Sequence, residues 1–555
     1  MPTDFFRKGL NVLLKRQTNI ISAAFIIMGT VIFSQLLGLV RQRLLVGFFG
    51  ASDTLGVYLV STRMPDFLFQ LIIAGALSSA FIPVFSDYLA KGKEDLAYRI
   101  ASTLLILSLL VFSIFSIILF IFANNFSKLM APGFSASQII LMANLMRLII
   151  FGELLFVVGS FLSAILQSFN HFFIPGIASA LYNLGIILGI LILYPFFGIF
   201  SAAFGVILGA LIFVLVQIPL IKKVGFSFKP SYSLESIKSS GVFEVLKLIW
   251  PRTLAIGVSQ LGTLITVTLV SFLPTPGRNY VIFDYAQTLA FAPVVLFGQA
   301  IAQAAFPVLS KEKDKMEDFK STFITSFNQV LYFVLPISVL LLVLRIPAVR
   351  LIFGAAQFDW AATVLTGKTL ALFSLSIFAQ ALVYLVSRGF YALHDTKTPL
   401  LISVFTTALM IGLAWVLMFF AKSGVLGIAL AFSIASIIDF LLLLIVLDRK
   451  VHGFAKKDLF LTDLKIFLAT VFTGFALYVP IKLLDQLVFD TTKTINLILL
   501  TGISSILGLS LYLFLTWVFD VKEAGMFILL FRKLGDWRQI LKKSDEAIDG
   551  TRFNP

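Results

Sequence analysis

The chain has 555 residues, of which 59% are hydrophobic, 14% aromatic and only 13% charged, and its net charge is +15. A soluble globular protein carries about 25% charged residues, so this composition excludes a water-soluble domain and predicts an all-helical protein that crosses a membrane many times. The chain has no cysteine, which excludes disulfide bonds, thiolate metal sites and cysteine nucleophiles.

The first apolar stretch runs from residue 20 to residue 40 and follows a basic segment. A cleaved signal peptide has an apolar core of only about 7–15 residues, so this longer stretch predicts a retained first helix. We expect its N-terminal side to lie in the cytoplasm. We also expect the span to end at the basic pair Arg41 and Arg43.

A membrane-spanning helix needs about 20 apolar residues, and the rest of the chain contains thirteen stretches that approach or exceed this length. They are residues 55–88, 100–122, 138–167, 172–195, 198–221, 245–273, 280–310, 322–345, 365–392, 398–420, 424–447, 463–485 and 494–519. The sequence therefore predicts an all-α polytopic membrane protein with about fourteen transmembrane helices.

Basic residues concentrate in alternate loops between these stretches. The positive-inside rule assigns such loops to the cytoplasm, and with an even number of spans it predicts that both chain ends are cytoplasmic. The high net charge is thus explained by topology and lipid contact rather than by nucleic acid, which we do not expect as a partner.

An internal repeat is indicated by short motifs at a constant offset. Pro83 and Pro307 lie in similar segments and are 224 residues apart (307 − 83 = 224), and the same offset joins Pro175 and Pro399 (399 − 175 = 224). The repeat predicts two homologous six-helix lobes with parallel orientation, and transporters of that symmetry bind substrate between lobes and use alternating access. The predicted parts are an N-lobe at 1–221, a cytoplasmic linker at 222–244, a C-lobe at 245–447, two further helices within 448–519, and a cytoplasmic amphipathic tail at 520–555.

Charged residues inside spans are costly and therefore mark candidate functional positions. Arg63 and Asp66 are three residues apart on one helical face, with Pro65 between them expected to open the backbone. They predict either a cation that faces an anionic substrate or a self-neutralising pair that fixes packing. Arg41 and Arg252 are further candidates, with interfacial anchoring as the alternative.

Two buried acids, Glu153 and Asp439, are candidates for proton or ion coupling, although such acids more often satisfy a neighbouring helix. No catalytic motif stands out. Gly367-Lys368-Thr369 resembles the end of a phosphate-binding loop, but Ala362 replaces its first glycine. We therefore expect a transporter without cofactor or metal, driven by an ion gradient, the membrane potential or the substrate gradient.

Several motifs resemble those of the MurJ (MviN) family of lipid II flippases. In the first half they are Ser34–Arg41, Gly50–Asp53, Arg63–Asp66 and Gly75–Phe85, and in the second half Gln299–Ala302 and Gly389–Pro399. The resemblance covers residues 20–450. It implies a fourteen-helix member of the multidrug/oligosaccharidyl-lipid/polysaccharide exporter superfamily.

The resemblance also implies a function and a set of site residues. Family members flip an undecaprenyl-diphosphate-linked peptidoglycan precursor, lipid II, from the inner to the outer leaflet, and their last two helices form a groove for the lipid tail. The resemblance implies Arg41, Asp53 and Arg63 as substrate-binding residues, and we expect Arg252, Gln35 and Asp66 to belong to the same site. Relatives often carry arginine at the positions of Gln35 and Thr288, so Arg252 is expected to supply the charge missing at Thr288.

Lipid II flipping in the bacterial cytoplasmic membrane is thus the leading hypothesis. We expect the protein to bind lipid II or a similar polyprenyl-diphosphate glycan and to contact membrane lipids. We expect it to act as a monomer, with the cell-wall synthesis machinery as a candidate protein partner. An exporter of another lipid-linked oligosaccharide, a MATE-like drug exporter and an inactive envelope scaffold are the alternatives.

Overall fold

The computed structural model describes residues 20–74, 81–230, 257, 260–454, 456–487 and 494–525, and every regular element in these ranges is a helix. Eleven of the described helices are long and apolar enough to cross a membrane, or twelve if one bent pair counts as a single span. The predicted all-α polytopic fold is therefore confirmed. Two further predicted spans, 55–88 and 245–273, include residues outside the described ranges, so the total of about fourteen stays a prediction.

The chain forms two compact units, Met1–Tyr280 and Val281–Pro555. Unit 1 also contains helix Gln260–Ser271 and the first turn of α13 (Pro276–Pro293). Its other elements are α2 (Ile20–Phe49), α3 (Asp53–Phe69), η1 (Gln70–Ala74), α4 (Ile82–Ala90), α5 (Glu94–Ile121), α6 (Ala123–Met130), α7 (Ala136–Ser168), α8 (Phe173–Phe197), α9 (Phe200–Leu215) and α10 (Ile218–Lys223).

Unit 2 continues with α13 and ends with two helices beyond the repeat. Its further elements are η3 (Val294–Gln299), α14 (Ala300–Lys311), α15 (Met316–Val343), α16 (Arg345–Phe353), α17 (Trp360–Ser374), α18 (Ile377–Ala392), α19 (Lys397–Phe419), α20 (Gly424–Lys450), α21 (Lys456–Leu487) and α22 (Thr494–Val518). The last two pack against each other, and both also pack against α15.

The backbone repeats itself at the offset that the motifs predict. A π-helix begins at Gln70 and again at Val294 (294 − 70 = 224). Asn170 and His394 both adopt positive φ angles, 61° and 59°, and they too are 224 residues apart (394 − 170 = 224). Equal interruptions at equal spacing agree with the predicted repeat.

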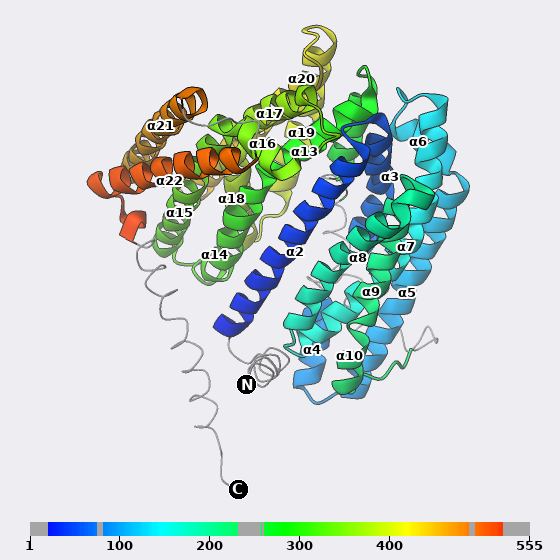
Figure 1. Cartoon of the computed structure of the whole chain (residues 1–555). Coiled ribbons are helices and arrows are strands. Elements are labelled where there is room, and N and C mark those ends of the chain that lie inside the picture. Colours follow the sequence, from blue (N-terminus) through cyan, green and yellow to red (C-terminus); the bar gives the residue numbers. More distant parts are fainter. Residues whose placement is uncertain are drawn as a thin grey trace, which may run out of the picture. The chain divides into compact units, whose positions relative to one another are not determined.

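Helix α7 is the central helix of unit 1. Half of its apolar window is buried, compared with 11% for α2, and it packs against α3, α5, α6 and α9. The neighbouring hairpin of α8 and α9, visible in Figure 1, is held together by small residues. A Cβ on Gly185 would lie 2.3 Å from Gly209 Cα, so only glycine permits this close approach.

The end of the first span differs from the prediction. Helix α2 continues to Phe49, so Arg41 and Arg43 lie within it rather than at its end. Gly47 lies inside α2 without ending it, whereas Gly50, which has a φ of 65°, follows the last helical residue, and Ser52 then caps the next helix. Pro65 does not open the backbone either, because α3 continues through it to Phe69.

The second half contains a bend that the sequence analysis missed. Helices α17 and α18 replace the single span predicted at 365–392, and they meet at an angle of 43°. Ser433 on α20 donates a hydrogen bond to the carbonyl of Leu372 at 2.8 Å, and Ser376 donates to the carbonyl of Phe373 at 3.0 Å. These hydroxyls satisfy the hydrogen-bonding capacity of carbonyl groups at the break, which contains neither proline nor glycine.

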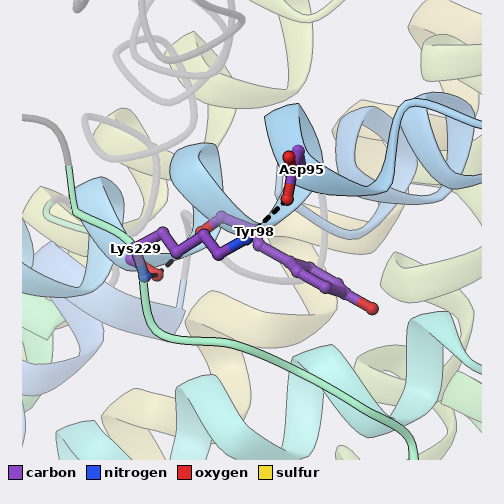
Figure 2. A network of polar contacts seen from close by, with 4 residues as sticks. Asp95, Tyr98 and Lys229 are labelled. Carbon is purple, nitrogen blue, oxygen red and sulfur yellow. Dashed lines mark hydrogen bonds and ion pairs between the residues drawn. The ribbon is translucent and has the colours of Figure 1, made fainter.

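The first residues of the predicted linker 222–244 are fixed to the start of α5. Lys229 Nζ donates to Asp95 Oδ1 at 2.7 Å, and the backbone nitrogen of Lys229 donates to Ser102 Oγ at 3.0 Å (Figure 2). Phe226 packs edge-on against Tyr98, with ring centres 5.2 Å apart. The linker beyond residue 230 and most of the predicted tail 520–555 lie outside the described residues.

Candidate functional site

The start of α3 is in close contact with the segment that leads into α13. Ser52 caps α3 by accepting a hydrogen bond from the backbone nitrogen of Leu55 at 3.2 Å. Asp53 Oδ1 accepts a hydrogen bond from the backbone nitrogen of Arg278 at 2.9 Å. A Cβ on Gly56 would lie 2.0 Å from Gly277 O, so the two backbones touch only because both residues are glycine.

A second contact joins helix Gln260–Ser271 to the loop after α6. Thr268 Oγ1 donates to the carbonyl of Met130 at 2.9 Å, and the backbone nitrogen of Gly133 donates to Ser271 Oγ at 3.2 Å. Both contacts are formed by segments that the loop-charge analysis assigns to the outer side of the membrane. Together they close unit 1 at one end.

Arg63 lies about three turns along α3 from these contacts. Its Nε donates to the hydroxyl oxygen of Tyr280 at 2.7 Å, and its guanidinium carbon lies 5.8 Å from the centre of the same ring. The Tyr280 side chain is buried, with 3% of its surface exposed, so it holds the guanidinium in a defined orientation. Tyr280 was not identified from the sequence, because no motif marks a tyrosine as the partner of a distant arginine.

Asp66 lies one turn beyond Arg63 on α3, which packs against α7, the helix that carries Glu153. The two helices touch one turn further along each of them, where the rings of Phe69 and Phe156 pack with centres 5.2 Å apart. Asp66 also interacts electrostatically with Arg63 on its own helix.

Arg41 on α2 interacts electrostatically with Asp66, with the buried Tyr58 and with the half-buried Tyr182. Among the described residues its guanidinium makes no hydrogen bond, so its donors are available to an anion. We call Arg41, Arg63, Asp66 and Glu153 the charge cluster. It is formed by α2, α3 and α7, with Tyr182 contributed by α8.

The other expected site residues lie elsewhere. Gln35 is exposed on α2, six residues and about 240° around the helix from Arg41, so it is not part of the charge cluster. Arg252, expected to replace the charge missing at Thr288, lies outside the described residues. Asp439, in unit 2, accepts a hydrogen bond at 2.9 Å from the hydroxyl of Thr406 on the neighbouring helix α19.

Comparison with known proteins gives a consistent result. The sequence profile of the family described as lipid II flippase MurJ matches residues 45–498. A relative from Buchnera aphidicola subsp. Acyrthosiphon pisum, described as "Probable lipid II flippase MurJ", is 28% identical over 503 residues, which cover 89% of this chain and 96% of that protein. A relative from Thermotoga maritima with the same description is 30% identical over 429 residues, 77% of this chain and 84% of that protein.

Solved structures agree with this assignment. A structure described as "Lipid II flippase MurJ, inward closed conformation" matches with a TM-score of 0.73 and 26% identity, covering 89% of this chain and 98% of that one. An inward-facing multidrug resistance MATE family transporter of the MOP superfamily matches with a TM-score of 0.67 but only 15% identity, covering 77% of this chain and 98% of the transporter, so it supports the fold alone. The chain is a multi-pass protein of the bacterial inner membrane, and it belongs to the lipid II flippase MurJ family.

Proposed function

We propose that this protein flips lipid II from the inner to the outer leaflet of the cytoplasmic membrane. The observation that carries the proposal is the pair of arginines, Arg41 and Arg63, on neighbouring helices of a family member. A diphosphate is strongly anionic and needs such cations to leave the headgroup region, because guanidinium groups bind phosphate oxygens with charge-assisted hydrogen bonds. The polyprenyl tail can remain in lipid throughout.

The proposed cycle is alternating access. With both chain ends in the cytoplasm, α3 begins at the outer surface, and the contacts of Asp53 with Arg278 and of Gly56 with Gly277 form the closed outer gate. Lipid II binds to the arginines from the cytoplasmic side. Separation of the gate contacts then opens the site toward the outer leaflet.

Two further parts of the protein, outside the charge cluster, belong to the proposed transport mechanism. Arg252 is the proposed third cation, and α21 and α22 are the proposed groove for the lipid tail. The protein acts as a transporter rather than an enzyme. It works as a monomer beside the cell-wall synthesis machinery, and its energy comes from the membrane potential or an ion gradient.

Growth of a bacterium depleted of its own flippase tests the assignment. Arg63→Ala should abolish complementation while the protein accumulates normally in the membrane, because the substrate loses its oriented cation. Arg147→Ala is the matched control, since Arg147 donates to the carbonyl of Phe120 on α5 at 3.1 Å rather than to a member of the charge cluster. Full growth with Arg63→Ala would refute the role of Arg63.

A further inference from the structure

Three buried side-chain oxygens of unit 2 have no hydrogen-bond partner among the described residues. They are Oδ1 of Asn328 on α15, Oδ1 of Asp463 on α21 and Oε2 of Glu523, which follows α22. Asn328 is only 7% exposed and Glu523 only 5%, so bulk solvent cannot replace the missing partners. A buried oxygen without a partner is costly, above all when it carries charge, and therefore points to a ligand.

Helices α15 and α21 pack against each other, and two contacts fix their register. Just before α21 begins, the ring of Phe454 stacks on that of Phe323, with centres 4.9 Å apart. Farther along, a Cβ on Gly474 would lie 3.0 Å from Cγ1 of Val339. The two contacts follow in the same order on both segments, so the helices run parallel and stay side by side between them.

Asn328 and Asp463 occupy equivalent positions between these contacts. Each lies eleven residues before the second contact, Asn328 before Val339 and Asp463 before Gly474 (339 − 328 = 11, 474 − 463 = 11). Eleven residues make about three helical turns, so both side chains lie at the same height and on the faces that meet farther along. The register therefore places both oxygens at the interface of α15 and α21.

Glu523 reaches the same height from the other side of α21. Helices α21 and α22 are joined by residues 488–493 and pack against each other, so they run antiparallel. They touch at Gly508, where a Cβ would lie 2.5 Å from Cδ2 of Leu477. Asp463 lies fourteen residues before Leu477 and Glu523 fifteen residues after Gly508 (477 − 463 = 14, 523 − 508 = 15). In an antiparallel pair, such equal separations lead to the same height.

Helix α22 also meets α15, one turn from Asn328. The Tyr332 hydroxyl lies 3.4 Å from Thr516 Oγ1, and the Tyr512 hydroxyl donates to the Tyr332 carbonyl at 2.8 Å. After Thr516 the chain leaves the helix through a turn and buries Glu523. The three unpartnered oxygens thus belong to three segments that converge at one end of unit 2.

The charges at this position are unbalanced. Among the described residues, neither Asp463 nor Glu523 forms an ion pair. Lys465 lies two residues and about 200° around α21 from Asp463, and Lys522, the neighbour of Glu523, is exposed. Two carboxylates and an amide oxygen form an all-oxygen ligand set with two negative charges, which suits a hard divalent cation.

We propose that Asn328, Asp463 and Glu523 bind one divalent cation of the hard class, such as Mg²⁺, with water completing its coordination. The cation neutralises the two carboxylates and gives each of the three oxygens a partner. It also joins α21 and the end of α22 to α15. The sequence analysis expected no metal, because these ligands are 135 and 60 residues apart and match no spacing motif (463 − 328 = 135, 523 − 463 = 60).

Electron paramagnetic resonance of Mn²⁺ tests the site in the purified full-length protein, because Mn²⁺ takes the same oxygen ligands as Mg²⁺ and loses its free-ion signal on binding. Wild-type protein should bind one Mn²⁺, and Mg²⁺ should displace it. Asp463→Asn and Glu523→Gln should each weaken Mn²⁺ binding at least about tenfold. Glu317→Gln is the matched control and should bind as wild type does, because Glu317 on α15 is 88% exposed in its pair with Lys320.

Thermal unfolding with and without MgCl₂ gives a second readout. Wild-type protein should unfold at a higher temperature with Mg²⁺, because a ligand of the folded state stabilises it. The unfolding temperatures of Asp463→Asn and Glu523→Gln should not depend on Mg²⁺. No binding of Mn²⁺ by wild-type protein, or equal affinity in wild type and both carboxyl variants, would overturn the proposal. Neither measurement involves lipid II, so failure of the cation site would leave the proposed function standing.

Discussion

At the scale of single residues, the orientation of Arg63 depends on a partner 217 positions away in the chain. The sequence identified Arg63 and Asp66 as a pair on one face of a helix. In the structure Arg63 also bonds to Tyr280, and the helix that carries Asp66 packs against α7, which carries Glu153. Partners on other helices could not be predicted because helix packing, not spacing along the chain, brings them together.

Tyr280→Phe tests how far the tyrosine hydroxyl positions Arg63. The substitution keeps the ring but removes the oxygen that accepts from Arg63 Nε, and a hydrogen bond to a charged group contributes about 1.5–3 kcal/mol. We expect lipid II flipping in proteoliposomes to fall about tenfold with normal expression. Tyr194→Phe, which removes only a 3.5 Å contact to the Phe48 carbonyl, is the control. Equal loss in both variants would contradict a specific role.

Asp395, in the loop before α19, gives a prediction about pH and stability. Partial burial alone would raise the pKa of Asp395, but hydrogen bonds from Lys450 and Thr398 outweigh it and lower this pKa from 3.8 to about 2. A lowered pKa stabilises the fold above the ordinary value, and the contribution is lost as the pH falls from about 4 toward 2. The ion pair with Lys450 therefore persists at every physiological pH.

Asp395→Asn should lower the free energy of unfolding by about 1 kcal/mol, by the same amount at all pH values between about 5 and 8. Thermal unfolding in detergent measures the difference. Asp87→Asn is the control, because the pair of Asp87 with Lys91 is more than half exposed and should contribute nothing measurable. A penalty for Asp395→Asn that grows across this pH range would show that the carboxyl titrates there.

At the scale of helices, the closest contact at the proposed outer gate is between two glycine backbones. Gly56→Val would place a Cβ 2.0 Å from Gly277 O, so α3 and the start of α13 must separate. We expect the charge cluster to become accessible from outside, measured as labelling of a cysteine introduced at Thr62 by an impermeant thiol reagent. Gly412→Val meets nothing within 4 Å and should change nothing. Unchanged labelling in Gly56→Val would contradict the gate.

The helix boundaries show which local features the sequence can and cannot reveal. Positive φ angles recur at Asn170 and His394, where the repeated motif predicts equivalent loops. The bend between α17 and α18 was missed because it lacks proline and glycine and depends on Ser433, which belongs to another helix. Breaks that side chains of other helices stabilise cannot be recognised from the broken segment alone.

At the scale of the whole molecule, alternating access requires the outer contacts of unit 1 to separate in every cycle. Cysteines at Met130 and Thr268 would join the end of α6 to helix Gln260–Ser271, where Thr268 now contacts the Met130 carbonyl. The chain has no native cysteine, so oxidation can form only this crosslink. We expect flipping to stop on oxidation and to return with reductant, while each single variant remains active. Full activity of the crosslinked protein would refute movement at this contact.

The sequence by itself determined that this protein is helical, lies in a membrane and consists of a repeated unit. These properties follow from apolar length, loop charge and a constant offset, all of which are properties of the chain read in one dimension. Only the tertiary structure decided which charges meet. Arg63 acquires Tyr280 as a partner, and α3 with Asp66 packs against α7 with Glu153, because tertiary packing places groups side by side that no sequence spacing connects.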